Sequence, residues 1–384
     1  MLILGIESSC DETAAAIVED GRLIRSSVIA SQHDLHAEFR GVVPELASRA
    51  HAERILPIIR AALRDANVSL ADLDAIAVGN RPGLIGSLLV GVAAAKALAW
   101  ALDSPLIAVD HVHAHLYSGL LQPPAAAIAS STFQHSLDDS LPLSPPHLLN
   151  SSPAHVHFPS LGLVVSGGHT SLYRLDSPTS LRRIGSTIDD ALGEAFDKAA
   201  TILGLPYPGG PNLDRLAQTP GANPRAHEFP ISRLAPDSLD FSFSGLKTSL
   251  LYRVRGLPEP GGVFTRDHAA LSLADRADLA ASFQHAAVKA VIIKIERALD
   301  RWPSLAPAGN PSPRALLVGG GVCANSSLRN ELARLTNARG LRLVLPPLSL
   351  CVDNAAMIAG LAFHLHAAGQ IADLDLQAYP ATGC

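Results

Sequence analysis

Short apolar runs separated by polar turns dominate the beginning of the chain. Residues 2–7 form an apolar run that predicts a buried strand, and residues 14–18 form a second one after a polar turn. Asp20-Gly21 is a typical hairpin dipeptide, and residues 23–29 supply a third strand. The pattern therefore predicts an antiparallel meander. It argues against a doubly wound dinucleotide-binding fold, which would place a helix after its first strand.

Helical periodicity follows the meander. Residues 44–63 and 85–102 have the spacing of helices, and the run 75–78 between them predicts a strand. A further strand over residues 106–109 leads into a helix that we expect to begin near Asp110.

The second half of the chain repeats the pattern of the first, with short apolar runs separated by turns. Residues 161–166 and 170–175 predict two strands joined by a glycine turn, and residues 315–318 predict a strand that leads into a helix over 325–335. One strand-turn-strand unit in each half indicates a duplicated architecture with a cleft between two lobes. Between the halves, residues 122–158 are rich in Pro, Ser, Ala and His without a sustained period, which is typical of an inserted, flexible loop.

Composition places the chain among globular proteins. Of its 384 residues, 48% are hydrophobic and 17% are charged, which argues against overall disorder. The net charge of −5 gives no bulk signal for nucleic acid, so a polyanionic partner must meet a local basic patch or a second subunit. Four scattered cysteines without a CxxC pair favour a reducing compartment.

Two features bear on the expected location of the protein. The first residues lack the basic segment and cleavage site of a signal peptide. The most apolar window, residues 84–102, is interrupted by Gly86, Gly91 and Lys96, which favours a buried helix over a membrane span. We therefore expect a cytoplasmic protein without a membrane contact.

Two histidines four residues apart are the first candidate for chemistry. On a helix, His111 and His115 lie on one face and can chelate one ion, whereas His113 points elsewhere. A metal needs a further ligand from a distant segment, and Asp353 is our candidate. The alternative is a pair of surface histidines in a chain that contains 16. A zincin protease is excluded, because Val112 stands where HExxH requires a glutamate.

Two glycine-rich turns could approach a nucleotide. The segment Ser166-Gly167-Gly168-His169 follows a predicted strand, and its backbone N–H groups could cradle a phosphate; an ordinary hairpin turn is the alternative. The segment 319–325 closes a strand and opens a helix, so it could approach a flat group such as adenine. There Asn325 is either a helix N-cap or a donor to a ribose or base.

Several carboxylates could take part in the same site. Asp11 and Glu12 lie in a polar turn, where they either position or deprotonate a nucleophile or form a solvated hairpin tip. Asp197, on an amphipathic helix, could accept from sugar hydroxyls. The aromatic-serine run 241–247 is expected to line a surface between the lobes, with Lys247 as a candidate for anion contact.

Taken in order, these segments resemble one family, the tRNA N6-adenosine threonylcarbamoyltransferases (bacterial TsaD, archaeal and eukaryotic Kae1). The resemblance covers most of the chain outside residues 122–158, 254–270 and the tail. Its matching stretches are GIESSCDETA, RGVVPELASRAH, PGLIGSLLVG, the HxxxH pair, LVVSGGHT, IDDALGEAFDKAA, YPGGP, LDFSFSGLKT, VGGGVCAN and DNAAMIAG.

The resemblance implies an α/β fold of the ASKHA class (actin, sugar kinase and Hsp70-like), with a ribonuclease H-like mixed sheet in each lobe. It implies an N-terminal lobe over 1–121, an insertion over 122–158 and a C-terminal lobe over 159–384, whose final helix can pack back across the cleft. The implied reaction moves the threonylcarbamoyl group of threonylcarbamoyl-AMP to N6 of adenosine 37 in tRNAs that read codons beginning with A, and releases AMP.

The resemblance also implies site residues and partners. The implied metal ligands are His111, His115 and Asp353, which hold one divalent ion, Fe(II) or alternatively Zn(II). Asp11, Glu12 and His169 are candidates for proton handling. The implied substrate-binding positions are Val164, Val165, Ser166, Gly167, Gly168, Asp197, Gly210, Asp214 and Asn325. TsaB-like and TsaE-like subunits are the implied protein partners.

The chain departs from the family pattern at Ala114, where glycine is usual, and at Asn80-Arg81, where small residues are usual. Two other functions remain open from the sequence. An ASKHA kinase or ATPase would share the phosphate loops but would not need the HxxxH pair. A non-catalytic paralogue that serves as a partner subunit would be expected to lose the metal ligands and glycine loops, which are present here.

Overall fold

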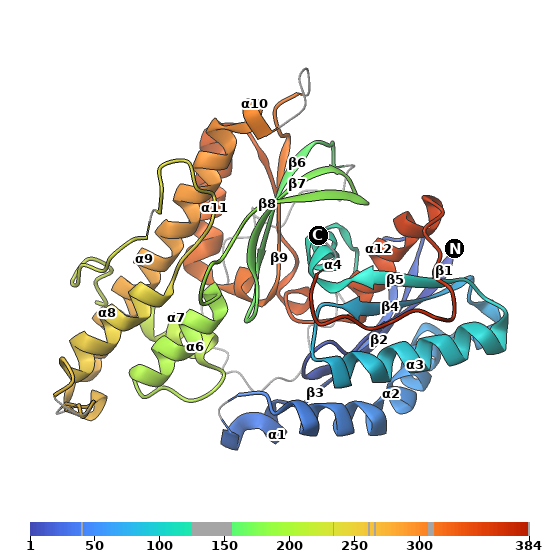
Figure 1. Cartoon of the computed structure of the whole chain (residues 1–384), viewed down its shortest axis with the longest axis horizontal. Coiled ribbons are helices and arrows are strands. Elements are labelled where there is room, and N and C mark those ends of the chain that lie inside the picture. The colour runs from blue at the N-terminus through green and yellow to red at the C-terminus, as the bar shows by residue number, and fades with distance from the viewer. Residues whose placement is uncertain are drawn as a thin grey trace.

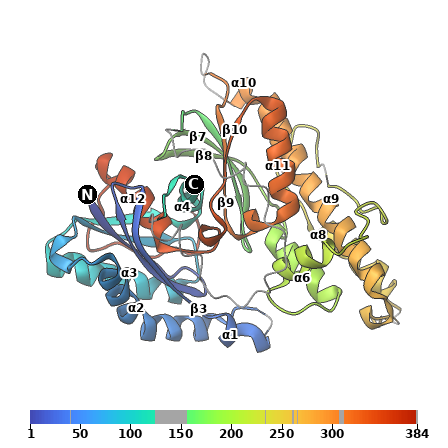
Figure 2. The same cartoon turned by 180° about the vertical axis from the view of Figure 1, so that it is seen from behind.

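A computed structural model of the protein describes residues 1–39, 41–123, 156–232, 234–259, 262–264, 266–305 and 311–382. Within these residues the chain forms two halves, each built around a five-stranded mixed sheet with helices against it (Figure 1, Figure 2). The interpretation of residues 122–158 as a flexible insertion falls almost wholly outside the described residues.

The first sheet confirms the predicted antiparallel meander. Its order is β3-β2-β1-β4-β5, with β1, β2 and β3 antiparallel and with β4 and β5 added parallel to β1. The polar turn before β2 is shorter than expected, because Glu12 already pairs with Ser31 of β3. The strands are β1 (Leu2–Glu7), β2 (Glu12–Glu19), β3 (Leu23–Ser31), β4 (Ala75–Arg81) and β5 (Leu106–Asp110).

The second sheet repeats this topology, which confirms the predicted duplication. Its order is β10-β9-β6-β7-β8, with β6, β7 and β8 antiparallel and with β9 and β10 added parallel to β6. The strands are β6 (Ser160–Val165), β7 (Thr170–Ser177), β8 (Ser180–Ser186), β9 (Ala315–Gly319) and β10 (Arg342–Val344). Taken from β8, the second order matches the first, so β6 corresponds to β1 and β9 corresponds to β4.

Helices cover both faces of the first sheet. On one face, α2 (Pro44–Ala66) and α3 (Ile85–Leu102) share a core with Leu4 and Ile17. On the other face lies α12 (Ala355–Ala367), which comes from the end of the chain and packs against β1 and β2 (Figure 1). The division of the chain at residues 121 and 159 stays a prediction.

The second sheet has a larger set of helices on one face. They share the largest core of the protein, which includes Phe196, Phe283 and Trp302. The helices of this half are α6 (Leu192–Ile202), α7 (Gly209–Ala217), α8 (Ser244–Arg255), α9 (Leu273–Asp300), α10 (Trp302–Leu305) and α11 (Ser326–Arg339). The short helix α1 (His33–His36) belongs to the first half.

One short helix, α4 (His111–Tyr117), joins the two halves. Its Ala114 and Tyr117 side chains pack into the core under α12, whereas Val112 and Leu116 pack against the free face of the second sheet. Because helical residues four apart lie on one face, this arrangement leaves His111 and His115 together on the remaining side. The fold therefore fixes the imidazole pair between the two sheets.

The apolar helix α3 is buried on one face rather than throughout. Leu88, Val92 and Ala95 enter the core, but the Trp100 side chain is 75% exposed. Among the described residues, α3 is the one helix that by length and composition could cross a membrane, a test that core helices of soluble proteins also pass.

The prediction that residues 241–247 line a surface between the lobes was wrong. Phe241 and Phe243 stack with ring centroids 6.1 Å apart and are fully buried in the core of the second half, because alternation in this segment turns both rings inward. Lys247 forms an ion pair of 2.8 Å with Asp190 and is therefore already paired with a carboxylate.

Candidate metal and nucleotide site

The helix that carries the histidine pair begins where the sequence predicts. Asp110, the last residue of β5, caps α4, because its carboxylate accepts hydrogen bonds from the backbone N–H groups of Val112 at 2.9 Å and His113 at 3.2 Å. An aspartate at this position satisfies two of the unpaired N–H groups of the first turn. The cap fixes the direction in which His111 leaves the sheet.

Asp353 lies directly before another capped helix. Its neighbour Asn354 is fully buried and accepts from the Met357 N–H at 3.0 Å, which starts α12. The Asn354 amide also donates to the Val352 carbonyl at 2.8 Å. These bonds hold the Asp353 backbone on both sides and leave its carboxylate 22% exposed.

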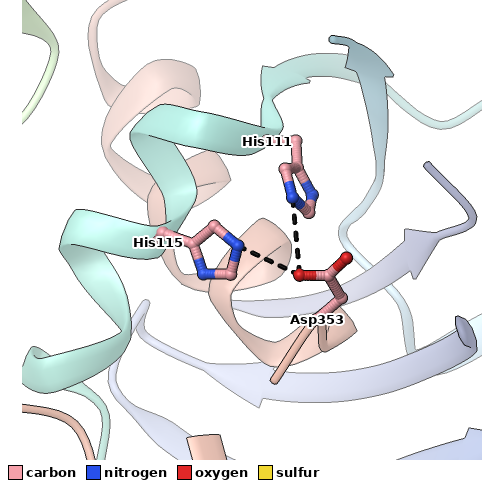
Figure 3. A group of neighbouring side chains, drawn as sticks. All are labelled: His111, His115 and Asp353. Atoms are coloured by element: carbon pink, nitrogen blue, oxygen red, sulfur yellow. Dashed lines mark hydrogen bonds and ion pairs between the residues drawn. The ribbon is translucent and has the colours of Figure 1, made fainter. Parts of the chain in front are cut away.

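The three predicted ligands converge, as Figure 3 shows. The Asp353 Oδ1 atom lies 3.1 Å from His115 Nε2 and 3.5 Å from His111 Nε2, and the donor atoms of all three residues lie within 4.8 Å of one another. Two imidazole nitrogens and one carboxylate oxygen are a donor set that divalent transition metals accept. These residues therefore fit a metal ion of that kind, and the carboxylate is partly open to a further ligand.

A second carboxylate orients the first imidazole. Glu7, at the end of β1, is fully buried and its Oε2 lies 3.0 Å from His111 Nδ1, while its Oε1 accepts from the Ser9 N–H at 2.6 Å. A carboxylate on Nδ1 turns Nε2 toward Asp353, which is how ligating histidines are usually held. The Nδ1 atom of His115 is buried and has no hydrogen-bond partner within the described ranges.

The charges around this cluster act strongly on one another. Burial lowers the pKa of His111, but the carboxylates of Glu7 and Asp353 outweigh it and raise that pKa to about 9. Burial raises the pKa of Asp353, and the two imidazoles outweigh it and hold that pKa well below its usual range. The two carboxylates that favour a positive charge on His111 would equally stabilise a bound cation at this cluster.

Replacing Glu7 by glutamine should weaken metal binding while preserving the shape of the site. The amide cannot supply the negative charge beside His111 Nδ1, so we expect a loss of metal affinity of about 10- to 100-fold. Competition with a chromophoric chelator measures this affinity. The matched control is Glu19→Gln, which removes only an exposed partner of Arg25 and should leave the affinity unchanged.

Asp11 and Glu12 lie in a second group of polar side chains. Together with His33 of α1 they place donor atoms within 4.8 Å of one another. Burial, followed by the charges of Asp353 and Asp11, raises the pKa of Glu12, which indicates that this group lies near the imidazole cluster. From the second half Tyr207 contacts His33, with ring centroids 5.8 Å apart.

The turn after β6 faces open space. The Ser166 hydroxyl accepts from the His169 N–H at 3.1 Å, and the Ser166 N–H donates to the His169 carbonyl at 2.8 Å, which closes the turn. A Cβ atom added at Gly167 or Gly168 would have no neighbour within 4 Å, and neither residue has a positive φ. The fold itself does not require glycine here, so the missing side chains leave the backbone N–H groups open to a ligand. Val164 and Val165, which precede the turn, are fully buried in β6.

His169 lies beside the imidazole pair. Burial and, to a smaller extent, the charges of His111 and His115 lower the pKa of His169 to about 4. At neutral pH its ring is therefore uncharged, and its unprotonated nitrogen can accept a hydrogen bond. The glycine turn therefore lies close to the cluster of His111, His115 and Asp353.

The other predicted substrate positions lie in two groups in the second half of the chain, and helix α7 contributes a residue to each group. Asp197 of α6 accepts from the Gly210 N–H at 3.0 Å, which joins α6 to α7. Asp214 accepts from the Ser326 hydroxyl at 2.8 Å and from the Gln284 amide at 3.0 Å.

Asn325 caps α11, which is one of the two roles that the sequence left open. Its Oδ1 accepts from the Leu328 N–H at 2.9 Å, and its Nδ2 donates to Gln284 Oε1 at 2.9 Å. Sequence reasoning missed Gln284 and Glu7. Glu7 carried a signal, because it is a carboxylate inside an otherwise apolar strand, whereas Gln284 lies in a helix that the sequence reading did not anticipate.

Two like-built halves with a polar site between their loops define a two-lobed α/β protein of the ASKHA class. A solved structure supports this fold: full-length HypF in its phosphate- and nucleotide-bound form aligns with a TM-score of 0.52 at 14% identity, over 98% of this chain and 47% of that one. The family model for TsaD, tRNA N6-adenosine threonylcarbamoyltransferase, matches residues 23–132 and 146–360.

Curated relatives agree with the family model. The tRNA N6-adenosine threonylcarbamoyltransferase of Moorella thermoacetica is 45% identical over 98% of this chain and 96% of its own. That of an Anaeromyxobacter species is 46% identical over 99% of both chains. The chain therefore belongs to the tRNA N6-adenosine threonylcarbamoyltransferase family and is a transferase. The relatives do not favour a kinase, an ATPase or a non-catalytic paralogue.

Proposed function

We propose that the protein transfers the threonylcarbamoyl group of threonylcarbamoyl-AMP to N6 of adenosine 37 in tRNAs that read codons beginning with A. The observation that carries the proposal is the convergence of His111, His115 and Asp353 beside the open glycine turn at residues 166–169. Family membership supplies the substrate class. In the reaction the N6 amine attacks the carbamoyl carbon, the bond from that carbon to the phosphate oxygen breaks, and N6 loses a proton as AMP departs.

The exocyclic amine is a weak nucleophile, so the protein must align the reactants and stabilise developing negative charge. The backbone N–H groups of Gly167 and Gly168 are suited to hold the phosphate, because nothing in the fold covers them. His169, whose buried ring is neutral at pH 7, is suited to accept a hydrogen bond from the N6 amine and is a candidate for proton handling. Asp11 and Glu12 are further candidates for proton handling, since Glu12 is close enough to Asp353 to be influenced by its charge.

The remaining family positions form the proposed wall for the adenosine part of the substrate. Val164 and Val165 place the turn, and Asp197 with Gly210 lies at the junction of α6 and α7. Asp214 and Asn325 hold the first turn of α11 through Ser326 and Gln284. We expect the last two residues to shape this wall through that network, with their polar atoms already engaged in it.

We propose one divalent metal ion per chain, held by His111, His115 and Asp353. A bound ion would supply Lewis-acid polarisation of a carbonyl or phosphoryl oxygen. Two histidines with one carboxylate and open positions are typical of Fe(II), and zinc is the alternative with the same donors. Elemental mass spectrometry of protein purified without oxygen distinguishes them, with about one iron per chain expected.

TsaB-like and TsaE-like subunits are the proposed protein partners, and tRNA is the proposed polyanionic one. The neighbouring helices α2 and α3 present large apolar side chains to solvent, which is unusual for a surface without a partner. These side chains are Leu46, Leu56, Ile85, Leu89 and Trp100. We place a protein partner, the TsaB-like subunit, on this apolar surface and the protein in the cytoplasm.

Replacing Trp100 by aspartate should weaken the complex with a TsaB-like subunit by at least about 30-fold, because a large aromatic anchor typically contributes 2 kcal/mol or more to an interface. Isothermal titration calorimetry with the purified subunit measures the change. Leu257→Asp is the matched control, since that side chain is 72% exposed in the other half of the molecule. If the wild type and the Trp100 variant bound the subunit equally tightly, the apolar surface would not be its docking site.

A transfer assay tests the function directly. Purified protein with its partner subunits is mixed with threonylcarbamoyl-AMP and a tRNA that carries adenosine at position 37, and the modified nucleoside and AMP are quantified by mass spectrometry. We expect equal amounts of both products, and none with guanosine at position 37. Transfer of a phosphoryl group from ATP to a small molecule with release of ADP, and no modified tRNA, would instead favour the kinase alternative.

A further inference from the structure

Two buried cysteines touch beside the proposed site. The Sγ atoms of Cys323 and Cys351 lie 3.4 Å apart, and both side chains are fully buried although they are 28 positions apart in the sequence. Cys323 lies in the turn after β9, and Cys351 follows the short helical turn Leu348–Leu350. A sulfur–sulfur contact at this distance needs only a small approach to become a covalent bond of about 2.05 Å.

The surroundings of the pair are not purely apolar. The Arg329 guanidinium donates to the Cys323 carbonyl at 2.7 Å, to the Pro346 carbonyl at 2.7 Å and to Cys351 Sγ at 3.3 Å. One cation thus ties both cysteine segments together. Reactive cysteines typically lie next to such a positive group, whereas inert buried cysteines lie among apolar side chains.

Each cysteine lies two residues before a residue of the proposed site. Cys323 precedes Asn325, which caps α11, and Cys351 precedes Asp353, which faces His111 and His115. A covalent bond would bring the two sulfur atoms more than 1 Å closer together, and we expect the backbone that leads to Asn325 and Asp353 to follow this approach. A misplacement of about 1 Å in a catalytic site can cost about 100-fold in rate.

We propose that Cys323 and Cys351 are a site of reversible disulfide formation that lowers the transfer activity. This inference rests on the proposed function for its effect on activity, but not for the chemistry of the pair. With a low-molecular-weight disulfide such as oxidised glutathione, one cysteine sulfur displaces a glutathione thiol and forms a mixed disulfide. The second cysteine sulfur then displaces the other glutathione thiol. The two cysteines are oxidised by two electrons, one glutathione disulfide is reduced to two thiols, and a thiol reductant reverses the exchange.

Equilibration of the full-length protein in glutathione buffers of graded redox potential tests the proposal. Because both sulfurs are buried, equilibration should extend over hours, until opening of the loops exposes them. Free thiols are then alkylated, and peptides are mapped by mass spectrometry without reduction. We expect one cross-linked peptide pair that joins Cys323 to Cys351 and disappears on treatment with dithiothreitol. Cys384→Ser should retain this cross-link, and Cys323→Ser should lose it.

Activity and metal content are measured on the same samples. For the wild type we expect the oxidised form to transfer at least about tenfold more slowly than the reduced form, with recovery on reduction, as a displacement of this size implies. The Cys323→Ser variant should show the same rate in oxidising and reducing buffer. Absence of the 323–351 cross-link, or a cross-linked protein as active as the reduced one, would overturn the proposal. Failure of the proposed function is distinguishable, because then the fully reduced protein would show no transfer at all.

Discussion

Replacing His111 and His115 together by alanine is expected to remove the metal ion and to lower kcat/KM for tRNA modification by about a thousandfold or more. Both Nε2 atoms face the Asp353 carboxylate, and a lone carboxylate cannot hold a transition metal against water. Loss of Lewis-acid stabilisation worth several kcal/mol corresponds to a rate loss of this size. Elemental mass spectrometry and the transfer assay measure the two effects.

His113→Ala is the matched control on the same helix. Its ring packs edge-on against Tyr173 with centroids 5.6 Å apart and lines a separate cavity of about 230 Å³ with Arg81 and Leu361. The control variant should retain a full complement of metal and most of its activity. If the double variant kept its metal and its activity, the ligand assignment would fail.

Gly193→Ala is expected to cause the second-largest loss, through the glycine turn. A Cβ atom at Gly193 would lie 2.6 Å from the Ser166 carbonyl oxygen and 2.8 Å from the Gly167 Cα atom, so α6 would have to move away from the turn. Overpacking of this kind typically costs about 1–3 kcal/mol of stability. Displacement of the turn should weaken adenylate binding at least about tenfold, which corresponds to a loss of about 1.4 kcal/mol of binding free energy.

Variants at two further glycines distinguish a loss of stability from a loss of adenylate affinity. Gly245 lies in α8 with no atom near its added Cβ, so Gly245→Ala should leave both stability and binding unchanged or slightly raise stability. Gly167→Ala should keep the stability and still weaken binding, because its methyl group would enter the space proposed for the phosphate. Urea denaturation and calorimetric titration with a non-hydrolysable adenylate analogue measure these quantities. A Gly193 variant with wild-type stability and affinity would contradict the account.

Much of the fold could be predicted because its strands are short apolar runs between unambiguous turns. The meander over β1, β2 and β3 and its counterpart around residues 167–168 are both visible in the sequence. The long helix α9 was not anticipated, since its buried face consists largely of alanines and is less distinct in hydrophobicity than a leucine face. The burial of Phe241 and Phe243 also escaped prediction, because serines alternate with the rings and suggest a surface.

The part of the candidate site that depends on the spacing of neighbouring residues could be predicted from the sequence. The four-residue separation of His111 and His115 needs only the helix period. Asp353, which was proposed as the distant carboxylate and is implied again by the resemblance, lies at the same point in the structure. The role of these residues as metal ligands stays a prediction. Contacts between distant segments, such as Glu7 with His111 and Cys323 with Cys351, depend on which strands lie side by side within a sheet, and local sequence does not specify this order.

Locating the bound metal decides whether His111, His115 and Asp353 are its ligands. Anomalous diffraction at the absorption edge of the metal, on crystals of protein purified without added ions, locates it independently of any assay. The account predicts one peak per chain within about 2.0–2.2 Å of His111 Nε2, His115 Nε2 and an Asp353 carboxylate oxygen. A fully occupied peak elsewhere on the chain, with these three side chains bonded only to one another, would contradict it.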